Sequence, residues 1–117
     1  MEVKLITFGE IEIDGERYEH DVVIEAGRVR KRAKKASKSF RSEYGHTPLS
    51  VEEEIPWGGK QLIVGTGVYG SLPIMPAVHE EAKRRGIEIV ALPTEDACRL
   101  LRECKRKDIY AVLHITC

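Results

Sequence analysis

The chain has 117 residues, of which 42% are hydrophobic and 32% are charged, and its 19 basic residues are balanced by 19 acidic ones. This length and composition favour a single globular domain over residues 1–117 and exclude a disordered chain. The zero net charge excludes steering toward any one class of partner by the overall field of the protein.

The sequence also indicates a cellular setting. No segment reaches the roughly 18 apolar residues of a membrane span, and the first residues lack the apolar block of a secretory signal. We therefore expect a cytoplasmic protein without membrane contact, with Cys98, Cys104 and Cys117 as free thiols. The lack of Asn and the single Gln, beside many charged residues, predict a thermophilic source.

The first third of the chain is typical of an antiparallel β meander. Val3–Phe8 predicts a strand, and the alternation in Glu10–Asp14 predicts a second one. Asp14-Gly15 is a strong hairpin signal, after which Tyr18–Glu25 predicts a third strand. A further short strand is expected to begin near Val29.

The next segment is rich in cations. Arg30–Tyr44 has few large apolar side chains, so we expect a basic helix or an exposed loop. Thr47–Glu53 then predicts a short helix, with Ser50 as its N-cap and Glu53 completing a capping box.

The second half predicts a β-α-β-α-β arrangement. The expected elements are a strand at Gln61–Val64, a helix at about Met75–Arg85, a strand at Gly86–Leu92, a helix capped by Thr94, and a strand at Ile109–Ile115. Helical crossovers favour parallel pairing. We therefore predict an α/β fold, partly of α+β character, in which an N-terminal antiparallel meander joins a mixed sheet with packed helices.

A glycine motif follows the strand at Gln61–Val64. Gly65-x-Gly67-x-x-Gly70 resembles a dinucleotide-binding turn, but two prolines delay the next helix and no acidic residue ends the next strand, so dinucleotide binding is not expected. One interpretation is that the glycines only allow positive φ and close backbone approach. The alternative is an anion-binding nest of backbone amides. The candidate ligand residues are Gly65, Thr66, Gly67, Tyr69, Gly70, Ser71 and Thr94.

The basic segment is the second candidate site. Its aromatic residues Phe40 and Tyr44 would suit single-stranded nucleic acid, but no nucleic-acid motif is present, and a solvated face partly paired with Glu52–Glu54 is the favoured interpretation. The candidate interaction residues are Arg30, Lys31, Arg32, Lys34, Lys35, Lys38 and Arg41.

No catalytic group or metal cluster stands out. The histidines share no ligand spacing, and His114 in an apolar strand predicts a hydrogen-bonded core histidine. Cys117 is either a reactive thiol or a buried one. We predict no catalytic residues, no metal and no cofactor, and we favour a non-enzymatic role.

Several motifs, taken in order, resemble one family. They are Phe8-Gly9-x-Ile11-x-Ile13-Asp14-Gly15, Asp21–Ile24, Leu62–Gly67, Gly86-Ile87, Thr94-x-x-Ala97 and His114–Cys117. The family is the domain of unknown function found in the adipogenesis-associated domain-containing protein and in a mitochondrial complex I assembly factor, with small archaeal and bacterial members. The chain departs from it in the last helix, where Leu101-Arg102 replaces a frequent Tyr-Asn pair.

The resemblance implies a compact α/β fold without established enzymatic activity, and a role in protein interaction or assembly support. From it we predict a protein partner. The alternatives are a small anion at the Gly65–Ser71 loop and, more weakly, nucleic acid on residues 28–41.

Overall fold

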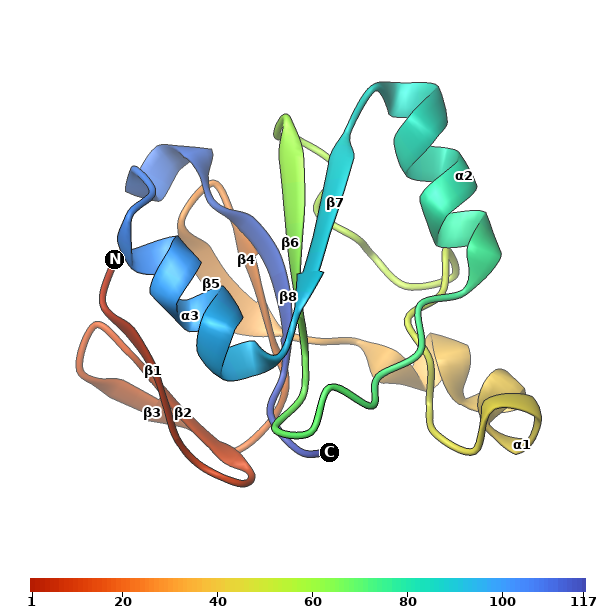
Figure 1. Cartoon of the computed structure of the whole chain (residues 1–117), viewed down its shortest axis with the longest axis horizontal. Helices are drawn as coiled ribbons and strands as arrows, with labels where there is room; N and C mark the ends of the chain where they lie inside the picture. Colours follow the sequence, from red (N-terminus) through yellow and green to blue (C-terminus); the bar gives the residue numbers. More distant parts are fainter.

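The computed structural model describes residues 1–117 and is built on a five-stranded mixed sheet (Figure 1). The strand order is β5-β4-β8-β6-β7. Strand β6 is parallel to both β7 and β8, whereas β4 is antiparallel to β8 and β5. The strands are β4 (Val22–Glu25), β5 (Arg28–Lys31), β6 (Gln61–Thr66), β7 (Glu88–Leu92) and β8 (Tyr110–His114). The predicted parallel half and the mixed sheet are confirmed.

A separate antiparallel sheet is formed by the first residues of the chain. It contains β1 (Val3–Thr7), β2 (Glu10–Ile13) and β3 (Glu16–Tyr18), in that order. The turn between β2 and β3 is Asp14-Gly15, and both residues have positive φ, as the hairpin signal predicts. The N-terminal meander is therefore confirmed.

The single strand predicted at Tyr18–Glu25 was wrong. The chain leaves the small sheet after Tyr18 and enters the large sheet at Val22. Asp21 lies in the break, where its Oδ1 accepts a 3.0 Å hydrogen bond from the amide of Ile115. A side chain that binds the end of another strand thus separates the two sheets, and a local pattern does not reveal this.

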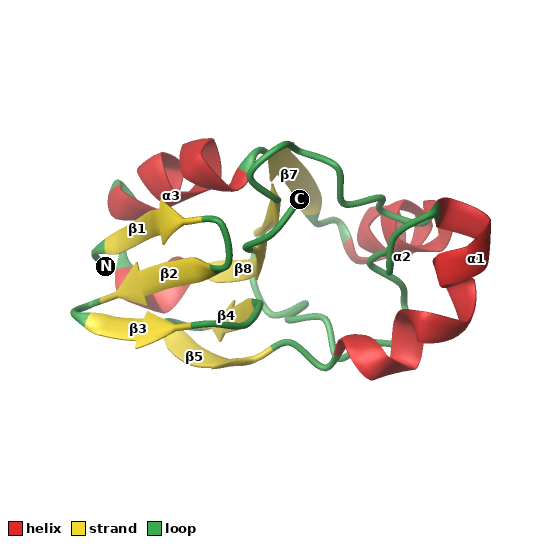
Figure 2. Ribbon diagram, turned by 90° about the horizontal axis from the view of Figure 1, so that it is seen from below, coloured by secondary structure: helices red, strands yellow, loops and turns green.

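Helices and the small sheet cover the two faces of the large sheet (Figure 2). Helix α3 (Thr94–Arg102) packs with the small sheet on one face, and α2 (Pro76–Arg85) packs on the other. Alternation along β4 divides the core, because Val22 and Ile24 join the α3 side while Val23 joins the α2 side. None of the helices is long and apolar enough to span a bilayer.

The basic segment is folded, and the helix predicted at Thr47–Glu53 is absent. A 3₁₀ helix, Lys34–Phe40, leads into the short α1 (Arg41–Tyr44), and a second 3₁₀ helix covers Arg106–Asp108. Residues 47–53 form an isolated bridge at Leu49 and a turn. The turn replaces the helix because Glu53, the expected capping-box residue, is used in a buried ion pair with Arg32.

Candidate functional site

Several loops gather at one edge of the large sheet. The parallel strands β6, β7 and β8 end at this edge, β5 also ends there, and β4 begins there. Figure 2 views the molecule from this side. Because ligands of open α/β sheets bind beyond the carboxyl ends of the strands, this edge is the first place to look for a site.

The glycine loop at this edge is filled by the chain itself. Gly67 has φ +108°, and a Cβ on it would lie 2.6 Å from the carbonyl carbon of Cys117. The amide of Val68 donates to the Thr116 carbonyl at 2.6 Å, and the amide of Ser71 donates to the Cys117 carbonyl at 2.9 Å. Glycine is therefore needed here because another segment, residues 115–117, packs against the loop.

Most amides of the proposed anion nest are already used. The amide of Gly67 donates to Thr94 Oγ1 at 2.8 Å, and the amide of Gly70 donates to the Gly67 carbonyl at 3.2 Å. Together with the bonds of Val68 and Ser71, these contacts leave little donor capacity for a ligand. An anion at this loop would have to displace hydrogen bonds within the chain.

Thr94 joins three segments and does not cap its helix. Its hydroxyl accepts from Gly67 and donates to the His114 carbonyl at 2.5 Å, while α3 has no side-chain cap. The predicted N-cap role was therefore wrong. The hydroxyl instead holds the ends of β6 and β8 against α3, so Thr94 does lie at the predicted loop.

Beside this loop lies a buried ion cluster centred on Arg32. Arg32 Nη1 donates to Asp21 Oδ2 at 2.9 Å, while Nε and Nη2 donate to the two oxygens of Glu53, both at 2.8 Å. Nη2 also donates to the Pro48 carbonyl at 3.1 Å. Two carboxylates and a carbonyl thus accept four hydrogen bonds from one buried guanidinium, so its charge is paired and its donors are satisfied.

His114 extends this cluster toward the end of β8. Its Nδ1 lies 2.8 Å from Asp21 Oδ2, and because an ionised carboxylate only accepts, Nδ1 carries the hydrogen. Burial alone would raise the pKa of Asp21, but His114, the Ile115 amide and Arg32 outweigh burial and lower the pKa to about 2. His114 is thus the hydrogen-bonded histidine that its apolar strand predicts.

Serine hydroxyls tie the 3₁₀ helix to the same cluster. Ser37 Oγ donates to Glu53 Oε2 and lies 2.6 Å from Ser50 Oγ, and both serines are buried. No buried side-chain nitrogen or oxygen lacks a partner. The basic segment is therefore attached to the core by its polar groups, although it contributes little apolar surface.

A hollow of about 660 Å³ opens above this cluster. Its lining includes Lys31, Lys34, Lys35 and Lys38, and we call it the lysine hollow. All four lysines are exposed, and none of them forms an ion pair. The folded basic segment thus brings together four of the seven cations that the sequence predicts as an interaction surface.

Of the other three predicted surface cations, only Arg32 lines the hollow. Arg32 is only 3% exposed and forms part of the hollow's base, so its prediction as a surface contact was wrong. Arg30 is half-buried and donates to the Glu54 carbonyl at 2.5 Å. Arg41 is exposed on α1, outside the hollow. Burial of Arg32 follows from its two carboxylate partners, Asp21 and Glu53. Pairing of the basic segment with Glu52–Glu54 was predicted, whereas pairing with Asp21 was not.

An exposed aromatic pair lies at the glycine loop. Phe8 is 52% exposed and Tyr69 is 74% exposed, and their ring centroids are 6.2 Å apart. The amide of Gly9 donates to the Ile115 carbonyl, so residues 115–117 support both the β1–β2 turn and the glycine loop. Phe8 had no predicted role at a site, since its partner is sixty-one positions away in the chain.

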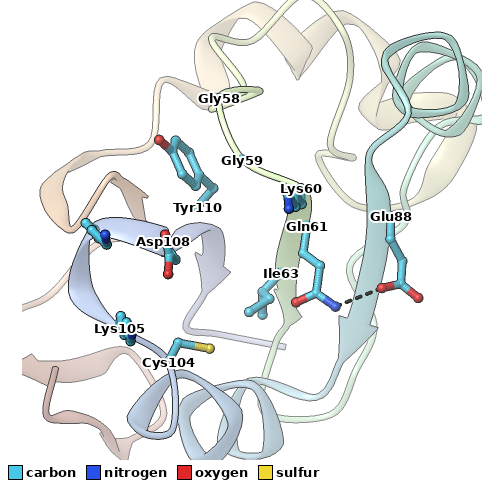
Figure 3. Close-up of a pocket in the computed structure, with 11 residues that line it drawn as sticks. Gly58, Gly59, Lys60, Gln61, Ile63, Glu88, Cys104, Lys105, Asp108 and Tyr110 are labelled. Carbon is cyan, nitrogen blue, oxygen red and sulfur yellow. Dashed lines mark hydrogen bonds between the residues drawn. The ribbon is translucent and has the colours of Figure 1, made fainter.

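A second hollow, of about 820 Å³, lies at the opposite edge of the sheet (Figure 3). Figure 3 shows Cys104, Asp108 and Tyr110 on one side and Gln61 and Glu88 on the other. Gln61 Nε2 donates to Glu88 Oε1 at 2.7 Å. Lysines and carboxylates both line this hollow, so it has no consistent sign of charge.

The Cys104 thiol in this second hollow is not activated. Burial, assisted by the nearby charges of Glu103 and Asp108, raises its pKa. No group of three or more His, Cys, Asp or Glu side chains is arranged to hold a metal ion. The second hollow therefore shows neither an activated nucleophile nor a metal site.

Comparison with known proteins identifies the family. A model of the family described as protein of unknown function (DUF498/DUF598) matches residues 3–114. The chain belongs to this family. The family assignment fits the resemblance seen in the motifs.

Two solved structures share the fold of this DUF498/DUF598 protein. The conserved hypothetical protein PH1505 from Pyrococcus horikoshii OT3 is 31% identical, with 100% of each chain covered and a TM-score of 0.81. A second structure, MT938, is 26% identical, with 94% of this chain and 93% of the other covered and a TM-score of 0.70. Neither name states an activity, so the functional argument rests on the site itself.

Proposed function

We propose that this protein is a protein-interaction module, in the manner of an assembly-support domain, and that its partner docks on Phe8 and Tyr69. The observation that carries the proposal is the exposed contact between these two rings. Full burial of a large apolar side chain contributes roughly 1.5–3 kcal/mol, so leaving two such rings in water forgoes a large part of that energy. Covering them with a partner would recover it.

The pair has the properties of an interface anchor. Aromatic residues are enriched among the few interface positions that dominate binding energy. The amides on both sides of Tyr69 are hydrogen-bonded within the chain, and Gly67 is packed against Cys117, so the loop is already ordered. An ordered anchor loses less conformational entropy on binding than a mobile one.

The alternative functions gain less support. The amides of the Gly65–Ser71 loop are mostly engaged, which disfavours an anion nest there. Phe40 and Tyr44 are half-buried and so present less ring surface for stacking on nucleic acid. Protein interaction is therefore the function that the exposed surface supports best.

A competition experiment tests the proposal. A photo-crosslinking phenylalanine analogue is placed at Tyr69, and the protein is irradiated in an extract of the source organism. We expect a discrete crosslinked product. Adding excess unlabelled wild-type protein should suppress this product, whereas adding excess of the double variant Phe8→Ser, Tyr69→Ser should not. The same analogue at Val51, an exposed residue outside the pair, serves as the control position.

Circular dichroism and urea unfolding first establish that the double variant is folded. Equal suppression by wild type and double variant would contradict docking on these rings. Crosslinking of equal yield at Val51 and Tyr69 would contradict it as well.

A further inference from the structure

The lysine hollow holds four lysine charges that no ion pair of the chain neutralises. Its lining also includes Arg32, whose charge is offset by Asp21 and Glu53, and the carboxylate of Glu19. Asp21 is already committed to Arg32 and His114. Glu19 is exposed and forms no ion pair, so it does not neutralise a particular lysine.

The lysines are held near one another by a rigid base. Ser37, at the middle of the 3₁₀ helix Lys34–Phe40, is fully buried against Ser50 and Glu53. Lys34, Lys35 and Lys38 flank it on the exposed side of the same short helix. Like charges repel, so an anion that binds between these lysines would relieve their repulsion.

The type of cation indicates the type of anion. The planar guanidinium of Arg32 suits a carboxylate, and it is already paired with Glu53 and Asp21. The free donors are lysine ammonium groups, which act as compact point charges and are common phosphate ligands. A phosphoryl group presents three oxygens, so several ammonium groups can contact it at once.

The size of the hollow limits the ligand. A volume of about 660 Å³ lies within the range of small-molecule sites. We propose that the lysine hollow binds a small organic molecule through its phosphoryl groups. The site involves neither Phe8 nor Tyr69, so this proposal is independent of the proposed docking of a protein partner.

Calorimetric titration with pyrophosphate tests this site, because pyrophosphate is a minimal probe with two phosphoryl groups. At constant ionic strength we expect saturable binding at one site per chain, and tighter binding than citrate shows. The triple variant Lys34→Gln, Lys35→Gln, Lys38→Gln should weaken binding at least about tenfold, a loss of about 1.4 kcal/mol.

A matched triple variant controls for general charge. Lys83→Gln, Lys105→Gln, Lys107→Gln changes the net charge by the same amount, and two of its positions line the second hollow. We expect less than about a twofold effect from it, because distant exposed charges are screened. The double variant of Phe8 and Tyr69 should bind pyrophosphate as wild type does.

Three results would overturn the proposal. The first is no saturable binding of pyrophosphate, and the second is equal weakening by both triple variants. The third is tighter binding of single-stranded oligonucleotides than of pyrophosphate, with an affinity that rises with oligonucleotide length. That result would show that the lysines bind nucleic acid.

Discussion

Arg32 and Glu53 form a two-point ion pair in which the side chains are 1% and 3% exposed. Both N–O distances are 2.8 Å, and the pair joins the segment after β5 to the loop before β6. A bidentate arginine–carboxylate pair combines charge with fixed geometry. Loss of this pair would therefore affect the position of the whole basic segment.

The first prediction concerns the geometry of this pair. Arg32→Lys keeps the charge but cannot maintain bonds to Glu53, Asp21 and Pro48 together. We expect the free energy of unfolding in urea to fall by about 3 kcal/mol, as for other broken buried pairs. Arg30→Lys is the matched control, because Arg30 pairs with an exposed Glu25 at 3.9 Å. Equal losses in the two variants would contradict the prediction.

The second prediction is that the neighbouring lysines are not structural. Lys34, Lys35 and Lys38 are exposed and unpaired, so each change to Gln should alter stability by at most about 0.5 kcal/mol. The triple variant should therefore unfold near the wild-type midpoint in thermal and urea melts. A loss comparable to that of Arg32→Lys would show that the lysines hold the fold together.

The third prediction is a pH dependence arising from Asp21. Its pKa is about 2 in the folded protein and near 3.8 when unfolded. A depressed pKa contributes stability that is present above about pH 4 and is lost as the pH falls toward 2. We expect this contribution to be about 2 kcal/mol, since one pKa unit corresponds to about 1.4 kcal/mol.

Urea unfolding at a series of pH values checks the Asp21 prediction. Asp21→Asn should be destabilised at pH 7, and its difference from wild type should shrink between pH 4 and pH 2. Asp96→Asn is the control, because Asp96 forms only an exposed pair with Arg99. Parallel pH curves for wild type and Asp21→Asn would contradict the assignment.

The fourth prediction compares two glycines of the same loop. Gly67→Ala places a Cβ 2.6 Å from the Cys117 backbone, whereas Gly70→Ala meets its nearest atom at 3.6 Å. Both have positive φ, which costs about 1–2 kcal/mol for a residue with a Cβ. The additional clash should make Gly67→Ala the more destabilising by about 1–3 kcal/mol in urea unfolding. Equal losses of stability in the two variants would show that residues 115–117 move easily to accommodate the added Cβ.

The fifth prediction concerns thiol reactivity. Burial raises the pKa of Cys98 to about 11, so very little thiolate exists at pH 8. Iodoacetamide should therefore label the partly exposed Cys117 in the native protein and leave Cys98 unmodified, as peptide mass mapping would show. In urea all three cysteines should react. Native labelling of Cys98 at the rate of Cys117 would contradict its burial.

The sequence predicted those elements whose signals are local. Asp14-Gly15 indicated its hairpin, where both residues adopt positive φ. The apolar runs predicted the parallel strands and the class of fold, because burial on both faces needs continuous hydrophobic sequence. The clustering of cations over residues 28–41 was also visible along the chain.

The candidate site depended on contacts that no local pattern reveals. Asp21 and His114 are separated by ninety-three positions, and Phe8 and Tyr69 by sixty-one. Glu53 fits a capping box and Thr94 fits an N-cap, yet each makes stronger bonds to a distant segment. A side chain takes the partner that satisfies it best once burial removes water, and only the assembled sheets decide which partner that is.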